Sequence, residues 1–211
     1  MKIDTDDFLN SIKESFARMK YIKSGEIPNI DLYMDQVTTF LDEKLKSSAR
    51  NSQEDEKLVT KTMINNYTKN DVIPPPIKKK YNKDHMFLLI FVYYYKSILQ
   101  INDIKTLLDP ITEDFFGKES GFCIEDVYDE IFGGMKERLA KITDDVVANY
   151  AESLESFEDA PIDKQEYLKK FYFICALSCD VFVKKLLIEK SVDSLREHRT
   201  TEENKYTAKG E

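Results

Sequence analysis

A cluster of lysines in the first half of the sequence is the group of residues best placed to do chemistry. Residues 57–83 contain seven lysines and one aspartate, a net charge of +6, whereas the whole chain of 211 residues carries −8 and the remainder therefore carries −14. Ammonium groups gathered in this way suit a surface that contacts phosphates, although a solvated face is the commoner fate of a charge run. The residues between the lysines decide between these two interpretations.

Those residues favour a surface for nucleic acid. Periodicity predicts a short helix over residues 58–70, with Thr60 as its N-cap and with Ile64 and Tyr67 on its inner side. The other side carries hydroxyl, amide and ammonium groups, which suit base edges and phosphates. Three successive prolines then favour an extended path, and a basic turn or short strand pair follows over 77–82. A helix followed by a basic wing is the layout of winged helix-turn-helix domains.

The segment VTKTMINNYTKNDVIP, residues 59–74, resembles the second helix and following loop of a MerR-type winged helix-turn-helix domain. In that family the helix follows the pattern Val-Ser-x-x-Thr-Leu-Arg-Tyr-Tyr, and Leu-Leu-Pro comes after a short gap. The positions that fit are Val59, Thr60, Ile64, Tyr67, Val72, Ile73 and Pro74. Tyr81 resembles the tyrosine of the wing, and the resemblance spans residues 32–108. It departs from the pattern at Asn65 and Asn66, where MerR proteins carry Arg and Tyr. It implies a winged-helix fold that binds duplex DNA as a homodimer.

The whole chain also resembles a bacterial family defined only as domain of unknown function 1836. The phrases that carry this resemblance are IDLYMDQVTTFL and LVTKTMINNYTKNDVIPPPIKKKY. The resemblance implies a cytoplasmic bacterial protein with a DNA-binding role, and it brings no enzymatic activity with it.

Other reactive residues give little signal for catalysis. The two histidines, His85 and His198, lie in no metal-binding or nucleophile motif, and the place of His85 at the start of a buried helix favours a capping or packing role. The sequence holds no GxGxxG or Walker loop, and the carboxylates of its second half lie on a polar helix face. We therefore expect no enzyme, no catalytic residue and no cofactor.

Two further groups leave alternatives open. Cys175 and Cys179, one turn apart, could form half of a metal site or a thiol sensor, but burial as small hydrophobes is favoured, so we expect no metal site. Tyr93, Tyr94 and Tyr95 could stack on bases. Successive helical residues point about 100° apart, which favours packing of these tyrosines against neighbouring helices instead.

Hydrophobic periodicity predicts the helices that must position these residues. Besides the helix over 58–70, the expected helices cover residues 4–22, 32–45, 83–99, 101–111, 124–154 and 163–196. Residues 46–57 are expected to form a loop. The expected boundary signals are Asp31 as an N-cap, Pro110 as a stop, the pair Gly133 and Gly134 as a bend, and Asp163 with Glu166 as a capping box.

These elements predict an all-α fold with a small β wing, in which a winged helix-turn-helix precedes a long-helix bundle. The expected divisions are 1–110 for a DNA-binding domain with an extra N-terminal helix, 111–198 for an α-helical effector or dimerisation region, and 199–211 for a flexible tail. The apolar middle of the last helix, FYFICALSCDVFVKKLLI, leaves three roles open. It could line a pocket for a small-molecule effector, form the seam of a homodimer, or form the core of the bundle.

The sequence shows no targeting signal, which leads us to expect a cytoplasmic protein without membrane contact. The sequence begins without an apolar leader, and its longest uncharged apolar run, residues 171–179, is far shorter than the ~20 residues of a membrane span. Three cysteines without framework spacing suggest reduced thiols.

The resulting hypothesis is a DNA-binding transcriptional regulator. Helix 59–70 would lie in the major groove, with its asparagines reading adenine, and the wing 77–82 would lie on backbone phosphates of double-stranded DNA. The expected DNA-binding residues are Thr60, Lys61, Thr62, Asn65, Asn66, Tyr67, Lys69, Lys78, Lys79, Lys80 and Tyr81. The alternative is a non-enzymatic protein-interaction module on the same scaffold, in which the basic strip meets an acidic partner. A salt-linked affinity for DNA separates the two hypotheses.

Overall fold

The computed structural model describes residues 10–11, 14, 21–46, 57–118 and 120–207. Most of the predicted helix 4–22 and of the predicted loop 46–57 lies outside these residues. The chain divides into two compact units. The first, here called the wing unit, is Lys20–Gly133 with Ile188–Glu211, and the second, the hairpin unit, is Gly134–Leu187 with Met1–Met19.

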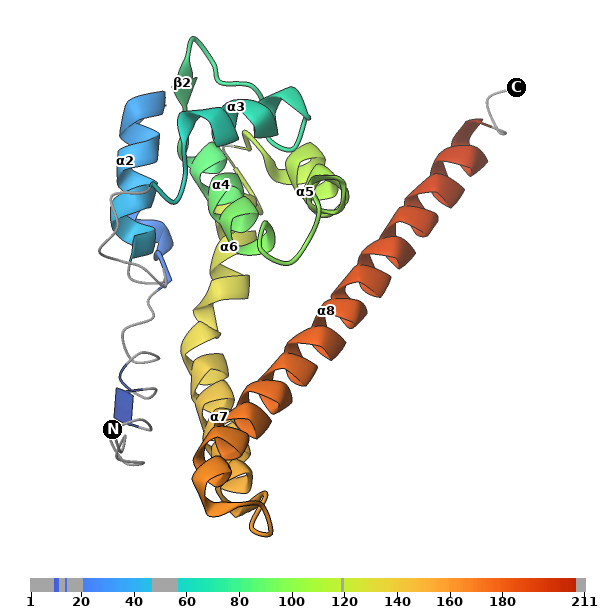
Figure 1. Ribbon diagram of the computed structural model, residues 1–211. Coiled ribbons are helices and arrows are strands. Elements are labelled where there is room, and N and C mark those ends of the chain that lie inside the picture. Colours follow the sequence, from blue (N-terminus) through green and yellow to red (C-terminus); the bar gives the residue numbers. More distant parts are fainter. Residues whose placement is uncertain (1–9, 12–13, 15–20, 47–56, 119, 208–211) are drawn as a thin grey trace. The chain divides into compact units, whose positions relative to one another are not determined.

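The wing unit is a set of helices with one small antiparallel sheet, so the predicted all-α fold with a β wing is confirmed (Figure 1). Its elements are a 3₁₀ turn η1 (Ser24–Glu26), β1 (Leu32–Tyr33), α2 (Met34–Leu45), α3 (Lys61–Lys69), β2 (Lys80–Tyr81), α4 (Lys83–Tyr95), α5 (Ile101–Phe115), α6 (Ile124–Gly133) and the C-terminal part of α8 (Ile162–Thr207).

Helix α4 forms the centre of this unit, which explains why its sequence is apolar on every side. All residues from His85 to Val92 are buried. Aromatic rings from α6 pack against it: the Tyr128 ring lies 4.7 Å from Phe87 and 4.5 Å from Phe132, between ring centroids. The Tyr128 hydroxyl donates a 2.5 Å hydrogen bond to the carbonyl of Ile22, and burial raises the pKa of this phenol strongly. The core therefore ties α4 and α6 to the chain before β1.

The start of α2 and the end of α4 differ from the predictions. Helix α2 begins at Met34 and not directly after Asp31, because Leu32 and Tyr33 pair with β2 first; the backbone N–H of Tyr33 then donates to Gln36 Oε1 at 2.9 Å. Helix α4 ends at Tyr95, short of the predicted residue 99.

Helix α5 continues through Pro110 to Phe115, so the prediction that this proline ends the helix was wrong. A proline inside a helix removes one backbone hydrogen bond and costs about 3 kcal/mol. The apolar positions Ile104, Leu108, Ile111 and Phe115 continue at helical spacing across it, and burial of that face offsets the loss. Residue 110, the expected end of the first domain, therefore lies inside a helix, and the predicted functional division there stays a prediction.

The hairpin unit contains α7 (Met135–Glu155) and the first part of α8, joined by a turn around Asp159–Pro161. Its core contains Val146, Tyr150 and Phe173, with Leu177 packed against them. The predicted single helix 124–154 is divided into α6 and α7 at Gly134, where two successive glycines weaken the helix. Helix α8 begins at Ile162, so Asp163 lies in its first turn and not at the predicted N-cap.

The middle of α8 contributes Phe173 to the core of the hairpin unit, and many of its other apolar side chains are exposed. Phe171, Ile174, Val181 and Phe182 are 49–67% exposed. Along the part of α8 whose side chains are described, as far as Thr201, the buried residues are Phe173 and Val192. Cys175 and Cys179 are exposed as well, so their expected burial was wrong. Among the described residues, none of the helices has the length and apolar character needed to cross a membrane.

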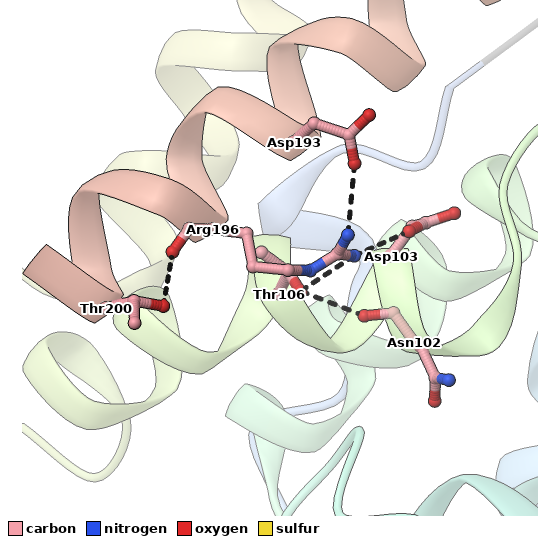
Figure 2. A network of polar contacts seen from close by, with 6 residues as sticks. All are labelled: Asn102, Asp103, Thr106, Asp193, Arg196 and Thr200. Atoms are coloured by element: carbon pink, nitrogen blue, oxygen red, sulfur yellow. Dashed lines mark hydrogen bonds and ion pairs between the residues drawn. The ribbon is translucent and has the colours of Figure 1, made fainter.

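The C-terminal part of α8 is joined to α5 by ion pairs within the wing unit (Figure 2). Arg196 donates to Asp103 of α5 at 2.8 Å and to Asp193 of its own helix at 3.0 Å. Arg199 lies 2.5 Å from Glu113 and 3.5 Å from Asp109. Helix α8 therefore supplies cations to an acidic face of α5.

Candidate nucleic-acid interface

The helix predicted over residues 58–70 is present as α3, and its ends are set by side-chain and backbone hydrogen bonds. Thr60 is the N-cap, as predicted, and its hydroxyl accepts from the backbone N–H of Met63 at 3.2 Å. The helix ends at Lys69 with Asn70 as its C-cap, after which Asp71 takes a left-handed conformation with φ +53°. Lys105 of α5 donates to the carbonyl of Asp71 at 3.3 Å and so holds this turn.

Helix α3 has one buried side and one exposed polar side. Ile64 is fully buried and Tyr67 is half-buried, and this burial raises the pKa of the Tyr67 hydroxyl. The structure brings five of the predicted contact residues together on the exposed side: Lys61, Thr62, Asn65, Asn66 and Lys69. No acidic residue occurs within α3, and the nearest carboxylate contact is an ion pair between Lys61 and Asp35 of α2. The exposed side is therefore polar and basic.

The predicted wing is a tight turn between Ile77 and Lys80. The backbone N–H of each residue donates to the carbonyl of the other at 3.0 Å. Lys78 and Lys79 between them have φ of +49° and +66°, the left-handed pair of a type I′ turn, which Asn-Gly usually occupies. For an L-residue with a Cβ this conformation costs roughly 1–2 kcal/mol. The left-handed conformation thus lowers the stability of the fold, and it places two exposed lysines at the tip of the wing.

Tyr81 supports the wing from beneath and is not part of its exposed surface. It is 2% exposed, so it lies in the core and not beside the exposed residues that were predicted to contact DNA with it. Burial raises the pKa of Tyr81, and a side-chain hydrogen bond with Thr68 of α3 opposes that shift. The tyrosine therefore connects β2 to the inner side of α3, and sequence spacing gave no sign of this contact.

His85 connects α4 to the proline segment and the wing, which confirms the expected capping role. Its backbone N–H donates to Asn82 Oδ1 at 3.1 Å, and its Nδ1 accepts from the backbone N–H of Asn82 at 3.2 Å. Its Nε2 faces the carbonyl of Pro75 at 3.4 Å. The ring also makes edge contacts with Tyr81 and Phe116, at 5.3 and 4.8 Å between centroids. Burial lowers the pKa of His85, although the carbonyls of Pro75 and Pro74 and nearby carboxylates oppose this.

This buried neutral histidine predicts a pH-dependent stability. The unfolded chain takes up a proton near pH 6.5, and native His85 resists doing so, so the free energy of unfolding should fall as the pH drops below that value. The contribution of His85 to the slope of the unfolding free energy against pH should approach about 1.4 kcal/mol per pH unit. Urea unfolding of wild type and His85→Gln between pH 7.5 and 5 checks this, because Gln suits the same capping position and does not titrate. His198→Gln, at an exposed histidine, is the matched control. If the unfolding free energy of the His85→Gln variant depended on pH as steeply as that of the wild type, the prediction would be contradicted.

The three successive tyrosines Tyr93, Tyr94 and Tyr95 are half-buried, and burial raises the pKa of each. Tyr94 packs on Phe132, at 5.4 Å between centroids, and the ammonium of Lys96 lies 4.9 Å from the Tyr93 ring. The contacts favour the packing interpretation of this run. In the described parts of the chain, no group of three or more His, Cys, Asp or Glu side chains could hold a metal ion.

The protein is thus an all-α chain with a small β wing, in which a basic turn follows an exposed polar helix. The chain belongs to the family described as domain of unknown function DUF1836, whose family model matches residues 22–131, just over half of the chain. The matched segment lies within the wing unit. No curated protein and no solved structure matches the sequence.

Sequence reasoning missed one part of this surface, the strand β1. Leu32 pairs with Tyr81 and Tyr33 pairs with Lys80, so the residues before α2 complete the wing. A two-residue strand carries too little alternation to be recognised. The signal that was available is the aromatic and β-branched content of Ile30 and Tyr33 directly before the helix.

Proposed function

We propose that this protein is a DNA-binding transcriptional regulator of the bacterial cytoplasm, built on a MerR-like winged helix-turn-helix. The exposed side of α3 enters the major groove, where Asn65 and Asn66 read base edges. Lys78 and Lys79 bind backbone phosphates from the wing. The alternative, a protein-interaction module without DNA binding, is an outcome of the test below.

One observation carries the proposal: two non-glycine residues of the wing, both lysines, are held in left-handed backbone conformations at the exposed tip of a turn. Backbone strain of this kind is typical of functional sites. Here the strained turn exposes two ammonium groups and no carboxylate. The exposed side of α3, a helix without acidic residues of its own, provides the adjoining polar surface and is connected to the same wing through Thr68 and Tyr81.

The proposal includes a homodimer in which a second copy of α8 covers the apolar stripe of the first. Tyr167, Phe171, Ile174, Val181 and Ile188 follow spacings of four, three and seven residues and are 37–67% exposed. A stripe with this heptad spacing suits another helix with the same repeat, which the second copy supplies. Two-fold symmetric half-sites on DNA require the same symmetry in the protein. A small-molecule effector remains a further proposal for this region, and light scattering that shows a monomer would contradict the dimer.

Fluorescence anisotropy with random-sequence duplex DNA, titrated at several salt concentrations, tests the proposed function. We expect micromolar binding, typical of non-specific contacts, that weakens linearly on a log–log plot against salt. Replacing Lys78, Lys79 and Lys80 together by Ala should weaken binding to every sequence and reduce the slope by up to about 3, because each phosphate contact contributes about 0.9.

The matched control removes three lysines elsewhere, Lys136, Lys141 and Lys190, all exposed, and should leave the slope within about 1 of wild type. Absence of duplex binding by the wild type at low salt would overturn the regulator. It would favour the interaction module, for which a pull-down of an acidic partner is the next experiment.

A further inference from the structure

We infer that the outer face of the two-stranded sheet, formed by Tyr33, Lys80 and Ile77, is a second part of the nucleic-acid interface. Its two apolar side chains would contact deoxyribose carbons, and its ammonium group a phosphate. We call these three residues the outer row. The inference rests on the proposed function and assigns new contact residues to it, since neither Tyr33 nor Ile77 is among the predicted DNA-binding residues.

The outer row follows from the register of the sheet. Tyr33 pairs with Lys80, and Lys80 pairs in turn with Ile77 on its other side. Residues directly opposite one another in antiparallel strands project on the same face. The neighbouring pair, Leu32 with Tyr81, projects on the opposite face and is 5% and 2% exposed. The outer row therefore lies on the face of the sheet turned away from the core.

The exposure of the outer row is large for its side chains. Tyr33 is 55% exposed and Ile77 is 63% exposed, on either side of the half-buried Lys80. The ammonium of Lys80 lies 5.2 Å from the centroid of the Tyr33 ring, a cation–π contact that holds both side chains in place. The left-handed lysines of the turn directly join Ile77 to Lys80. Two apolar groups are thus placed beside three cations on one small element.

This alternation of apolar and cationic groups fits the backbone of a nucleic acid. Tyrosine and lysine are among the side chains that contact phosphate and sugar, and such contacts set the position of a protein on the duplex without reading sequence. An anionic membrane surface would also attract cations, but the strength of binding there grows with the apolar area that is buried in the lipid. The outer row offers two apolar side chains, so the duplex is the partner that it fits.

The two kinds of contact have different signatures in a salt titration. Losing a lysine–phosphate contact reduces the slope of affinity against salt, because fewer counterions are released. Losing an apolar contact weakens binding at every salt concentration and leaves the slope unchanged. We expect the double variant Tyr33→Ser with Ile77→Ser to bind random duplex DNA about 10-fold more weakly at each salt concentration, with the wild-type slope. The variant Tyr33→Phe keeps the ring and should bind as the wild type does.

Folding controls are available for this experiment. The cap of α2 uses the backbone N–H of Tyr33, which the substitution leaves in place, and urea unfolding checks that the variant is native. Ile98→Ser, at an exposed isoleucine outside the sheet, is the matched control for Ile77→Ser and should bind normally.

The outcomes separate the inference from the proposed function. A natively folded double variant that binds duplex DNA as tightly as the wild type would overturn the inference and leave the regulator standing. A reduced slope would also overturn it, since the row would then act through charge. Binding to vesicles of phosphatidylserine and phosphatidylcholine that the double variant loses, without change in duplex binding, would reassign the row to a membrane. Absence of any duplex binding by the wild type would overturn both.

Discussion

The double variant Lys78→Asn with Lys79→Gly should be more stable than the wild type and should bind DNA less well. Asn-Gly adopts the type I′ turn without the Cβ clash that Lys78 and Lys79 incur at φ +49° and +66°. Relief of that clash, less the chain entropy of glycine, should raise the free energy of unfolding by about 1–2 kcal/mol. Loss of two phosphate contacts should reduce the salt slope of duplex binding by about 2.

These opposite directions make the variant informative, because a misfolded protein cannot be both more stable and less able to bind. Urea unfolding followed by circular dichroism gives the first quantity, and anisotropy titrations give the second. Lys23→Asn with Lys118→Asn removes the same charge at two exposed sites outside the wing and should leave the salt slope near that of the wild type. A free energy of unfolding below that of the wild type in the Lys78→Asn, Lys79→Gly variant would show that the wild-type turn is not strained.

Replacing Phe87 by Ala should be the most destabilising single change among those considered for the wing unit. Phe87 is fully buried on α4, and its ring packs on Tyr128, whose ring packs in turn on Phe132. A Phe→Ala change in such a site removes buried apolar surface and leaves a cavity, which costs about 3–5 kcal/mol. That is a large share of the roughly 5–15 kcal/mol that stabilises a domain. The loss of unfolding free energy is measured by the shift of the urea midpoint, with an unchanged dependence of the free energy on urea concentration.

A phenylalanine on the surface provides the control for this prediction. Phe122 is 58% exposed and contacts the Phe115 ring from outside the core, so Phe122→Ala should change the free energy of unfolding by no more than about 0.5 kcal/mol. Phe87→Leu, which keeps most of the volume, should fall between the two. Equal losses at Phe87 and Phe122 would contradict the central position of α4.

Local signals in the sequence predicted helix α3 and the central helix α4. Thr60 and Asn82 are N-caps whose side chains bond within three residues, and the apolar run of α4 requires burial wherever it lies. His85 was expected to cap or pack for the same local reason. The basic turn was predicted from composition alone, because Lys78 and Lys79 follow three prolines that exclude a helix.

Contacts between distant segments could not be predicted in this way. Strand β1 pairs with β2 across more than forty residues, and its two residues carry no periodicity. Burial of Tyr81 depends on the same pairing and on Thr68, so its assignment to the surface failed. Helix α5 continues through Pro110 because its apolar face, buried before the proline and half-buried after it, packs along its length. The exposure of the apolar middle of α8 likewise depends on contacts between distant segments. Each failure concerns tertiary contacts that outweighed a local rule.

The ion pairs between α8 and α5 also have a consequence for the order in which the protein can fold during synthesis. Asp103, Asp109 and Glu113 leave the ribosome long before Arg196 and Arg199, because residues 134–187 of the hairpin unit are synthesised in between. The wing unit is therefore interrupted in the sequence, and the acidic face of α5 stays without these two arginines until the end of the chain emerges. A chain that ends after residue 133 contains the complete family segment, yet it lacks both arginines that pair with this acidic face.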